Sequence, residues 1–210
     1  MNIQIRLEQP GDYRTVEELT REAFWNLYVP GCSEHLLVHK LRSNPAFIPE
    51  LNFVALKDDR SVGNIVFCYA AIKEDAGNQR AVITFGPVSV LPEFQKQGIG
   101  AALIQHALKT AADLGYTAVL IYGDPAYYPR FGFRSAKEFN IRTSEGKFLE
   151  ALMALELSDG ALASVSGCFF EGEAYNVDEE ELVEFEKTFP HKEKFVTESQ
   201  KRFLELSSSE

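Results

Sequence analysis

The pattern of hydrophobic and polar residues divides the first half of the chain into strands and helices. Residues 3–7 alternate apolar and polar, which is typical of a strand with one buried face. Helical spacing follows over residues 13–27, after Asp12 as a predicted N-cap, and again from Ser33 to Leu41. Three further segments, rich in β-branched and aromatic residues and separated by polar turns, are predicted strands: residues 51–57, 61–73 and 81–90.

The same analysis continues from Ile99. Apolar residues recur there at helical spacing as far as Leu114, and Gly115 supplies a C-terminal stop. Residues 118–122 form a short, nearly all-apolar run, as expected for a strand buried on both faces. Residues 149–157 resemble a late strand that completes a sheet.

Beyond this point we expect an extension, residues 158–210, attached to a core of residues 1–157. Residues 148–186 contain eleven acids and no Lys or Arg. Asp178 is a predicted cap for a helix over 178–189, and Thr197 opens a capping box for a terminal helix. The apolar stripes of these helices must pack on the core or on a second subunit, so a homodimer stays open; they comprise Leu182, Phe185, Phe189, Phe203, Leu204 and Leu206.

The charge balance limits the partners. The 210 residues carry a formal net charge of −10, whereas binding to nucleic acid requires clustered Lys and Arg. We therefore expect no nucleic-acid partner, and an acidic protein of this kind is compatible with a cationic or amine-bearing substrate.

The location is predicted to be cytoplasmic. No apolar run reaches the ~18 residues of a membrane span, and the N-terminus lacks the apolar centre of a signal peptide. Cys32, Cys68 and Cys168 are odd in number and widely spaced, which indicates reduced thiols. Cys68 stands within an apolar strand and is expected to be a core residue.

A glycine-containing loop, Gln95–Gly100, connects the strand 81–90 to the following helix. Its two glycines leave the backbone accessible, and the unpaired N–H groups of a helix N-terminus attract phosphate. A P-loop would continue Gly-Lys-Ser/Thr, whereas Ala101 and Ala102 follow here. A dinucleotide fingerprint requires a third small residue where Leu103 stands, and a shorter linker after Val90.

The Gln-x-x-Gly-x-Gly pattern after Val88-Ser89-Val90 instead resembles the pyrophosphate-binding arm of the GNAT N-acetyltransferase superfamily. One helix and one strand later, Tyr127–Phe133 is similar to the Phe-Tyr-x-x-x-Gly-Phe-like segment of that family. From this pair the chain is identified as a GNAT member. The resemblance implies an α/β (α+β) fold with a central mixed, mostly antiparallel, twisted sheet flanked by helices, here with a helical C-terminal extension.

The resemblance also implies acetyl-CoA as co-substrate, and we expect no metal. The pantetheine arm would lie along Val88, Ser89 and Val90, and Phe131 would pack beside it. The diphosphate would contact the glycine loop and the first turn of the helix; the residues implied are Gln95, Lys96, Gln97, Gly98, Ile99, Gly100 and Ala101.

Tyr128 occupies the family's tyrosine position and is the candidate general acid. A tyrosine has an ordinary pKa near 10, above that of a thiol at about 8.5, so it stays protonated until the CoA thiolate leaves. The amine would attack the thioester directly. No residue stands out as the general base; Glu22, Glu34 and Glu93 are the candidates.

Several alternatives remain open on sequence alone. The chain could be a non-catalytic acyl-CoA-binding sensor or interaction module, or a nucleotide-binding Rossmann domain. His35 and His39 have metal-compatible spacing, but no third ligand is suggested nearby, so they could contact substrate instead. The acceptor itself, a small-molecule or peptide amine, is not identified by any motif.

Overall fold

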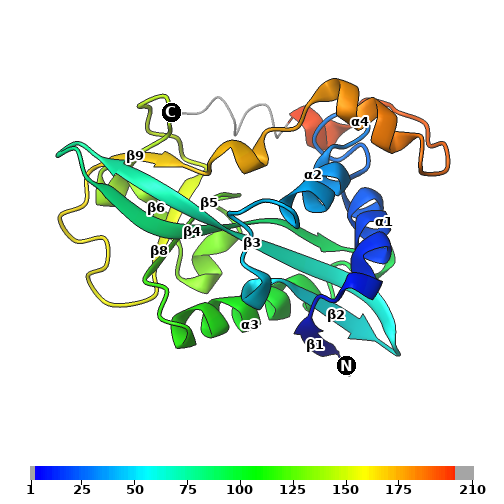
Figure 1. The fold of residues 1–210 in the computed structure, drawn as a ribbon, viewed down its shortest axis with the longest axis horizontal. Helices are drawn as coiled ribbons and strands as arrows, with labels where there is room; N and C mark the ends of the chain where they lie inside the picture. Colours follow the sequence, from blue (N-terminus) through cyan, green and yellow to red (C-terminus); the bar gives the residue numbers. More distant parts are fainter. Residues whose placement is uncertain (1–2, 202–210) are drawn as a thin grey trace.

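The computed structural model describes residues 3–201, and it contains one mixed sheet with helices on both faces (Figure 1). Most of the predicted terminal helix, with Phe203, Leu204 and Leu206, lies outside this range. The strands are β1 Gln4–Leu7, β2 Phe53–Lys57, β3 Arg60–Glu74, β4 Gln79–Val90, β5 Ala118–Tyr122, β6 Arg134–Ser135, β7 Ile141–Arg142, β8 Leu152–Glu156 and β9 Gly167–Phe170. The α-helices are α1 Tyr13–Phe24, α2 Glu34–Leu41, α3 Ile99–Asp113 and α4 Glu179–Glu186.

The strand order is β1-β2-β3-β4-β5-β8-β6, with β9 beside β3 and β7 beside β9. Along the main path the neighbours are antiparallel except β4 and β5, which run parallel. The long strand β3 pairs with β2 near its beginning and with β9 through residues 71–74 near its end. The expected mixed, mostly antiparallel sheet is therefore confirmed.

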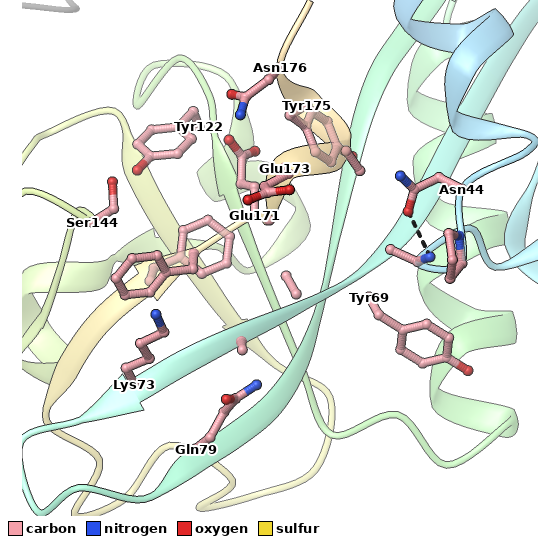
Figure 2. A pocket seen from close by; sticks show the side chains of 18 residues that line it. Asn44, Tyr69, Lys73, Gln79, Tyr122, Ser144, Glu171, Glu173, Tyr175 and Asn176 are labelled. Carbon is pink, nitrogen blue, oxygen red and sulfur yellow. Dashed lines mark hydrogen bonds between the residues drawn. The ribbon is translucent and has the colours of Figure 1, made fainter.

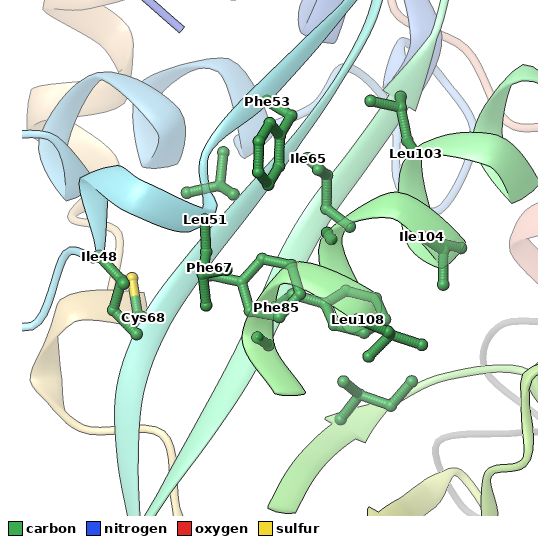
Figure 3. Packing of buried hydrophobic residues seen from close by; sticks show 14 of the residues in the cluster. Ile48, Leu51, Phe53, Ile65, Phe67, Cys68, Phe85, Leu103, Ile104 and Leu108 are labelled. Atoms are coloured by element: carbon green, nitrogen blue, oxygen red, sulfur yellow. The ribbon is translucent and has the colours of Figure 1, made fainter. Parts of the chain in front are cut away.

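Successive residues of strand β3 point to opposite faces of the sheet, one covered by α3 and the other by α1. A Cβ at Gly63 would lie 3.2 Å from Leu103 of α3, whereas the next residue, Asn64, bonds to Thr20 of α1. The α3 face holds the main core; Figure 3 shows this packing, which includes Phe53, Ile65, Phe67, Phe85, Leu103, Ile104 and Leu108. Burying one such side chain stabilises the fold by roughly 1.5–3 kcal/mol.

The sheet opens between β4 and β5. Their register contains a single pair, Ile83 with Val119, and β4 has a bulge between Phe85 and Val88. Residues 88–90 pair with β3 on one edge, and within the described part of the chain no strand pairs with their other edge. A backbone edge in the middle of the sheet thus has no strand partner within the described residues.

Residues 158–201 add both sheet and helix. Strand β9 extends the sheet, a short 3₁₀ turn, Glu173–Tyr175, follows it, and α4 lies next to α2 in Figure 1. The predicted cap of α4 is confirmed, because the Asp178 carboxylate accepts the Glu181 N–H at 2.9 Å. Arg21 of α1 forms an ion pair with Glu186, which fastens α4 to the first helices.

The structure differs from the sequence prediction at several points; helix α4, for example, ends at Glu186 rather than at residue 189. The first helix ends at Phe24 rather than residue 27, because Asn26 adopts a left-handed conformation (φ 58°) and its side-chain oxygen accepts the Gly31 N–H. Asp12 does not cap that helix through its side chain; it forms an ion pair with Arg6 and accepts the Gln9 N–H at 2.8 Å. Strand β8 begins at Leu152 rather than at residue 149.

No helix of residues 3–201 combines the length and apolar character needed to cross a membrane.

Candidate active site

Two side chains of the glycine loop form hydrogen bonds to the backbone of the preceding residues and hold the loop in place. Gln95 donates its side-chain amide to the Val90 carbonyl at 3.0 Å, and Gln97 donates in the same way to Glu93 at 3.0 Å. Lys96 and Gly98 have left-handed φ angles of 58° and 85°, which turn the chain into α3. Gly98 is the N-cap and provides no side chain to satisfy the N–H groups of the first turn. Those groups form a site suited to an anion.

The open edge of β4 presents the backbone of alternate residues. The Leu91 N–H donates to the Val62 carbonyl of β3 at 2.9 Å. Because successive N–H groups of a strand point to opposite edges, those of Val88 and Val90 point toward the gap beside β5. Ser89 is fully buried, and its hydroxyl donates to Thr20 at 3.1 Å, so its side chain ties β4 to α1.

Tyr128 begins the 3₁₀ turn Tyr128–Phe131, which follows β5. Its ring packs in an aromatic cluster with Phe85 at 6.0 Å, Phe133 at 5.7 Å and Tyr127 at 5.3 Å between ring centroids. Burial raises the pKa of Tyr128, and neighbouring Tyr28 adds to the effect. The phenol therefore stays protonated across the physiological pH range.

The same turn adjoins the glycine loop. A Cβ at Gly100 would lie 4.0 Å from the Tyr127 hydroxyl, and Phe131 packs edge-on against Tyr127 with ring centroids 5.5 Å apart. The Asp124 carboxylate accepts the Ala126 N–H at 2.8 Å, which fixes the approach to the turn. The two sequence motifs, about 30 residues apart, thus lie beside each other in the structure.

Gly123 allows Tyr128 to adopt this position. A Cβ at Gly123 would lie 2.4 Å from two carbons of the Tyr128 ring, a distance that packed atoms do not tolerate. We expect Gly123→Ala to displace that ring and to destabilise the fold by about 1–3 kcal/mol, as overpacking does. It should also lower kcat of acetyl transfer, the activity that the sequence resemblance implies. Denaturant unfolding and steady-state kinetics measure both effects. Gly11→Ala, whose Cβ has no heavy atom within 4 Å, is the matched control. Unchanged stability and kcat in Gly123→Ala would contradict this role.

A small pocket of about 240 Å³ lies where Tyr128 meets the β4 bulge. Glu34 of α2 lines it, and burial raises the pKa of this carboxyl. The other two candidate bases do not line this pocket: Glu22 pairs with Lys192, and Glu93 pairs with Arg60. The remaining lining residues are Phe24, Tyr28, Leu37, Phe85, Gly86, Pro87, Val88, Tyr122, Tyr128, Glu171 and Tyr175.

Most of these lining residues were not predicted from the sequence, and two of them, Glu171 and Tyr175, come from the C-terminal part of the chain. Both follow β9, whose pairing with β3 brings them beside β4, where the Tyr175 hydroxyl donates to the Gly86 carbonyl at 3.2 Å. A larger cavity of about 950 Å³ adjoins the small pocket, because Tyr122, Glu171 and Tyr175 line both (Figure 2). In the sequence, only the acidic stretch around Glu171 could have indicated that this segment contributes to the pocket.

His35 and His39 do not line the pocket. His35 is fully buried under α4, with its Nε2 2.9 Å from Glu186, and burial lowers its pKa to about 4. His39 points to the surface and contacts Glu17 at 2.9 Å. Residues 3–201 contain no group of three or more His, Cys, Asp or Glu side chains suited to a metal.

The chain is similar in sequence to known acetyltransferases. The family described as "Acetyltransferase (GNAT) domain" matches residues 49–135, a range that includes the glycine loop and Tyr128. YhbS, an uncharacterized N-acetyltransferase of Escherichia coli K12, is 31% identical over 173 residues, which cover 82% of this chain and 98% of YhbS. YjhQ of the same organism is 32% identical over 97 residues, 46% of this chain and 53% of YjhQ.

Two solved structures are similar over most of their length. The crystal structure of Escherichia coli YhbS in complex with CoA aligns with a TM-score of 0.74 and 28% identity, covering 84% of this chain and 93% of YhbS. A GNAT acetyltransferase of Brucella melitensis in complex with acetyl-CoA aligns with a TM-score of 0.68 and 27% identity, covering 83% and 99%. The chain belongs to the GNAT N-acetyltransferase family, as its sequence predicted.

Proposed function

We propose that this chain transfers an acetyl group from acetyl-CoA to a primary amine by direct attack, with Tyr128 as general acid for the departing thiolate. One observation carries the proposal: Tyr128 and the open-edge residue Val88 line the same small pocket. Acetyl-CoA is the co-substrate, in keeping with the CoA and acetyl-CoA complexes of the two similar structures.

The cofactor is held in two parts. The diphosphate lies on the backbone N–H groups at the start of α3, from Gln97 to Ala101, where the helix dipole favours negative charge. The pantetheine extends along the unpaired edge of β4, whose Val88 and Val90 amides bond to it like those of an added strand. Lys96, which is exposed, adds positive charge beside the diphosphate, and Phe131 packs near the arm.

Charge then develops at two atoms. As the amine attacks, the thioester oxygen becomes negative, and an outward-pointing N–H of β4 stabilises it. As the C–S bond breaks, Tyr128 donates its proton to sulfur. The raised pKa of Tyr128 means that the phenol, not the phenolate, faces the sulfur at neutral pH. A phenolate there would repel the departing thiolate.

The acceptor is proposed to be a cationic amine, on a small molecule or a peptide. The small pocket combines two carboxyl groups, Glu34 and Glu171, with the rings of Tyr28, Tyr122 and Tyr128. Carboxylates pair with an ammonium ion, and aromatic faces attract it through cation–π interaction. An acceptor with a negative charge beside its amine would be disfavoured.

The test is acetylation of a panel of primary amines by the purified chain, with release of CoA thiol and mass of the product as readouts. We expect one acetylated amine for each CoA released, with cationic amines preferred over neutral analogues. If acetyl-CoA binds but no amine of a broad panel accelerates CoA release, the chain is an acyl-CoA-binding sensor and the proposed activity is wrong.

A further inference from the structure

The small pocket contains an acid supplied by the C-terminal part of the chain. Glu171 stands directly after β9, and it lines both the small pocket with Tyr128 and the larger cavity that opens beside it. Figure 2 shows Glu171 in the part of the cavity bounded by Tyr122 and Tyr175. A molecule that passes from the larger cavity into the pocket of Tyr128 therefore passes this carboxyl.

The surroundings of Glu171 shift the pKa of its carboxyl toward neutral pH, where the group can accept and release a proton. Burial raises the pKa of its carboxyl to about 7, so protonated and charged forms are both populated near that pH. The groups around it are mostly uncharged at pH 7 or acidic, and Lys73 is the cation among the residues that line the larger cavity. The titratable groups facing it or lining these cavities are Tyr28, Glu34, Cys68, Tyr69, Lys73, Tyr122, Tyr128, Glu173 and Tyr175.

Glu34 is the other acid of the small pocket, but its carboxylate already has a structural partner. Its Oε2 accepts the Ser33 N–H at 3.0 Å at the beginning of α2. It also lines the small pocket without lining the larger cavity. Glu34 can therefore attract the ammonium ion, whereas Glu171 stands at the junction where that ion arrives.

We propose that Glu171 is the general base that deprotonates the acceptor amine. This inference rests on the proposed acetyl transfer and names the general base, which the sequence did not identify. It also gives residues 158–210 a role in the site itself, because they supply both Glu171 and the neighbouring Tyr175.

The protons balance in five transfers. The ammonium ion gives one proton to the Glu171 carboxylate, and the freed nitrogen lone pair forms the C–N bond with the thioester carbon. The C–S bond breaks, and its electron pair on sulfur takes the proton of Tyr128. The nitrogen loses its second proton to solvent, and Tyr128 regains one from solvent. Glu171 then releases its proton, so each turnover yields one amide, one CoA thiol and one proton.

The sign of the pH dependence follows from the role. A base acts only when deprotonated, so kcat/KM of the wild type should rise with pH and level off above an apparent pKa near 7. Glu171→Gln should lower kcat/KM by about 100-fold and remove this inflection. Glu171→Asp keeps a carboxylate and should retain the inflection at a reduced rate. Glu179→Gln, an exposed acid of α4 that lines neither cavity, should retain both rate and inflection.

The experiment is a set of pH–rate profiles for the wild type and these three variants, with one amine that the wild type acetylates. Thermal unfolding and acetyl-CoA titration confirm that each variant is folded and binds cofactor. A folded Glu171→Gln that keeps the wild-type rate and inflection would overturn the role of Glu171 while leaving acetyl transfer intact. A wild type that binds acetyl-CoA and acetylates no amine would instead overturn the proposed function, and the base with it.

Discussion

Replacing Tyr128 with Phe should lower kcat for amine acetylation by about 10²- to 10⁴-fold, the range typical of a lost general acid. The ring would keep its contacts with Phe85 and Phe133, so the pocket should retain its shape. What disappears is the proton that neutralises the CoA thiolate. The affinity for acetyl-CoA should therefore be nearly unchanged, because the hydroxyl acts on charge that develops after binding.

Kinetics with a series of acyl donors whose thiol leaving groups differ in pKa can show whether Tyr128 acts by donating a proton. The deficit of Tyr128→Phe should shrink as the thiol becomes more acidic, since a stable thiolate needs no proton. Tyr13→Phe, which removes a hydroxyl at the beginning of α1, is the matched control and should have wild-type kinetics. A deficit of the same size for every leaving group would indicate that Tyr128 only shapes the pocket.

Sequence patterns predicted the elements whose residues interact locally. The strand 81–90, the glycine loop and the helix beginning at Ile99 are consecutive, and their order sufficed to predict an anion site at the start of α3. The cap of α4 was predictable for the same reason, since Asp178 and Glu181 are three residues apart. In each case the signal and its partner lie within a few residues of each other.

Contacts between distant segments could not be predicted in this way. Glu171 reaches the pocket because β9 pairs with residues 71–74 of β3, almost 100 residues earlier. Its short apolar run, Cys168-Phe169-Phe170, has no periodicity that would name β3 as a partner. His35 shows the converse. Its spacing from His39 suggested a metal ligand, but Phe185 of α4 and Phe189, which follows that helix, pack against its ring and bury it.

Gly100→Glu should abolish acetyl-CoA binding. The substitution adds a carboxylate in the first turn of α3, where the diphosphate is proposed to lie. Two unit charges 4 Å apart near a protein surface repel by about 4 kcal/mol, which weakens Kd by roughly 10³-fold. The fold should tolerate the change, because a Cβ at Gly100 makes its nearest contacts at 3.6 Å with Val90 and 4.0 Å with Tyr127.

The variant Gly100→Ala distinguishes the effect of added charge on acetyl-CoA binding from the effect of added side-chain volume. Its methyl group fits the same space without adding charge, so it should weaken binding far less than the Glu variant. Similar losses in both variants would indicate that the close approach of the backbone, rather than repulsion, dominates at this position.

Calorimetric titration of acetyl-CoA into the wild type and Gly100→Glu tests the central claim most directly, because every step of the proposed reaction depends on cofactor bound at the glycine loop. We expect one molecule of acetyl-CoA per wild-type chain, and no measurable binding to a Gly100→Glu chain whose unfolding curve shows that it is folded. Unchanged affinity in the folded Gly100→Glu variant would contradict the account, because the diphosphate would then lie elsewhere.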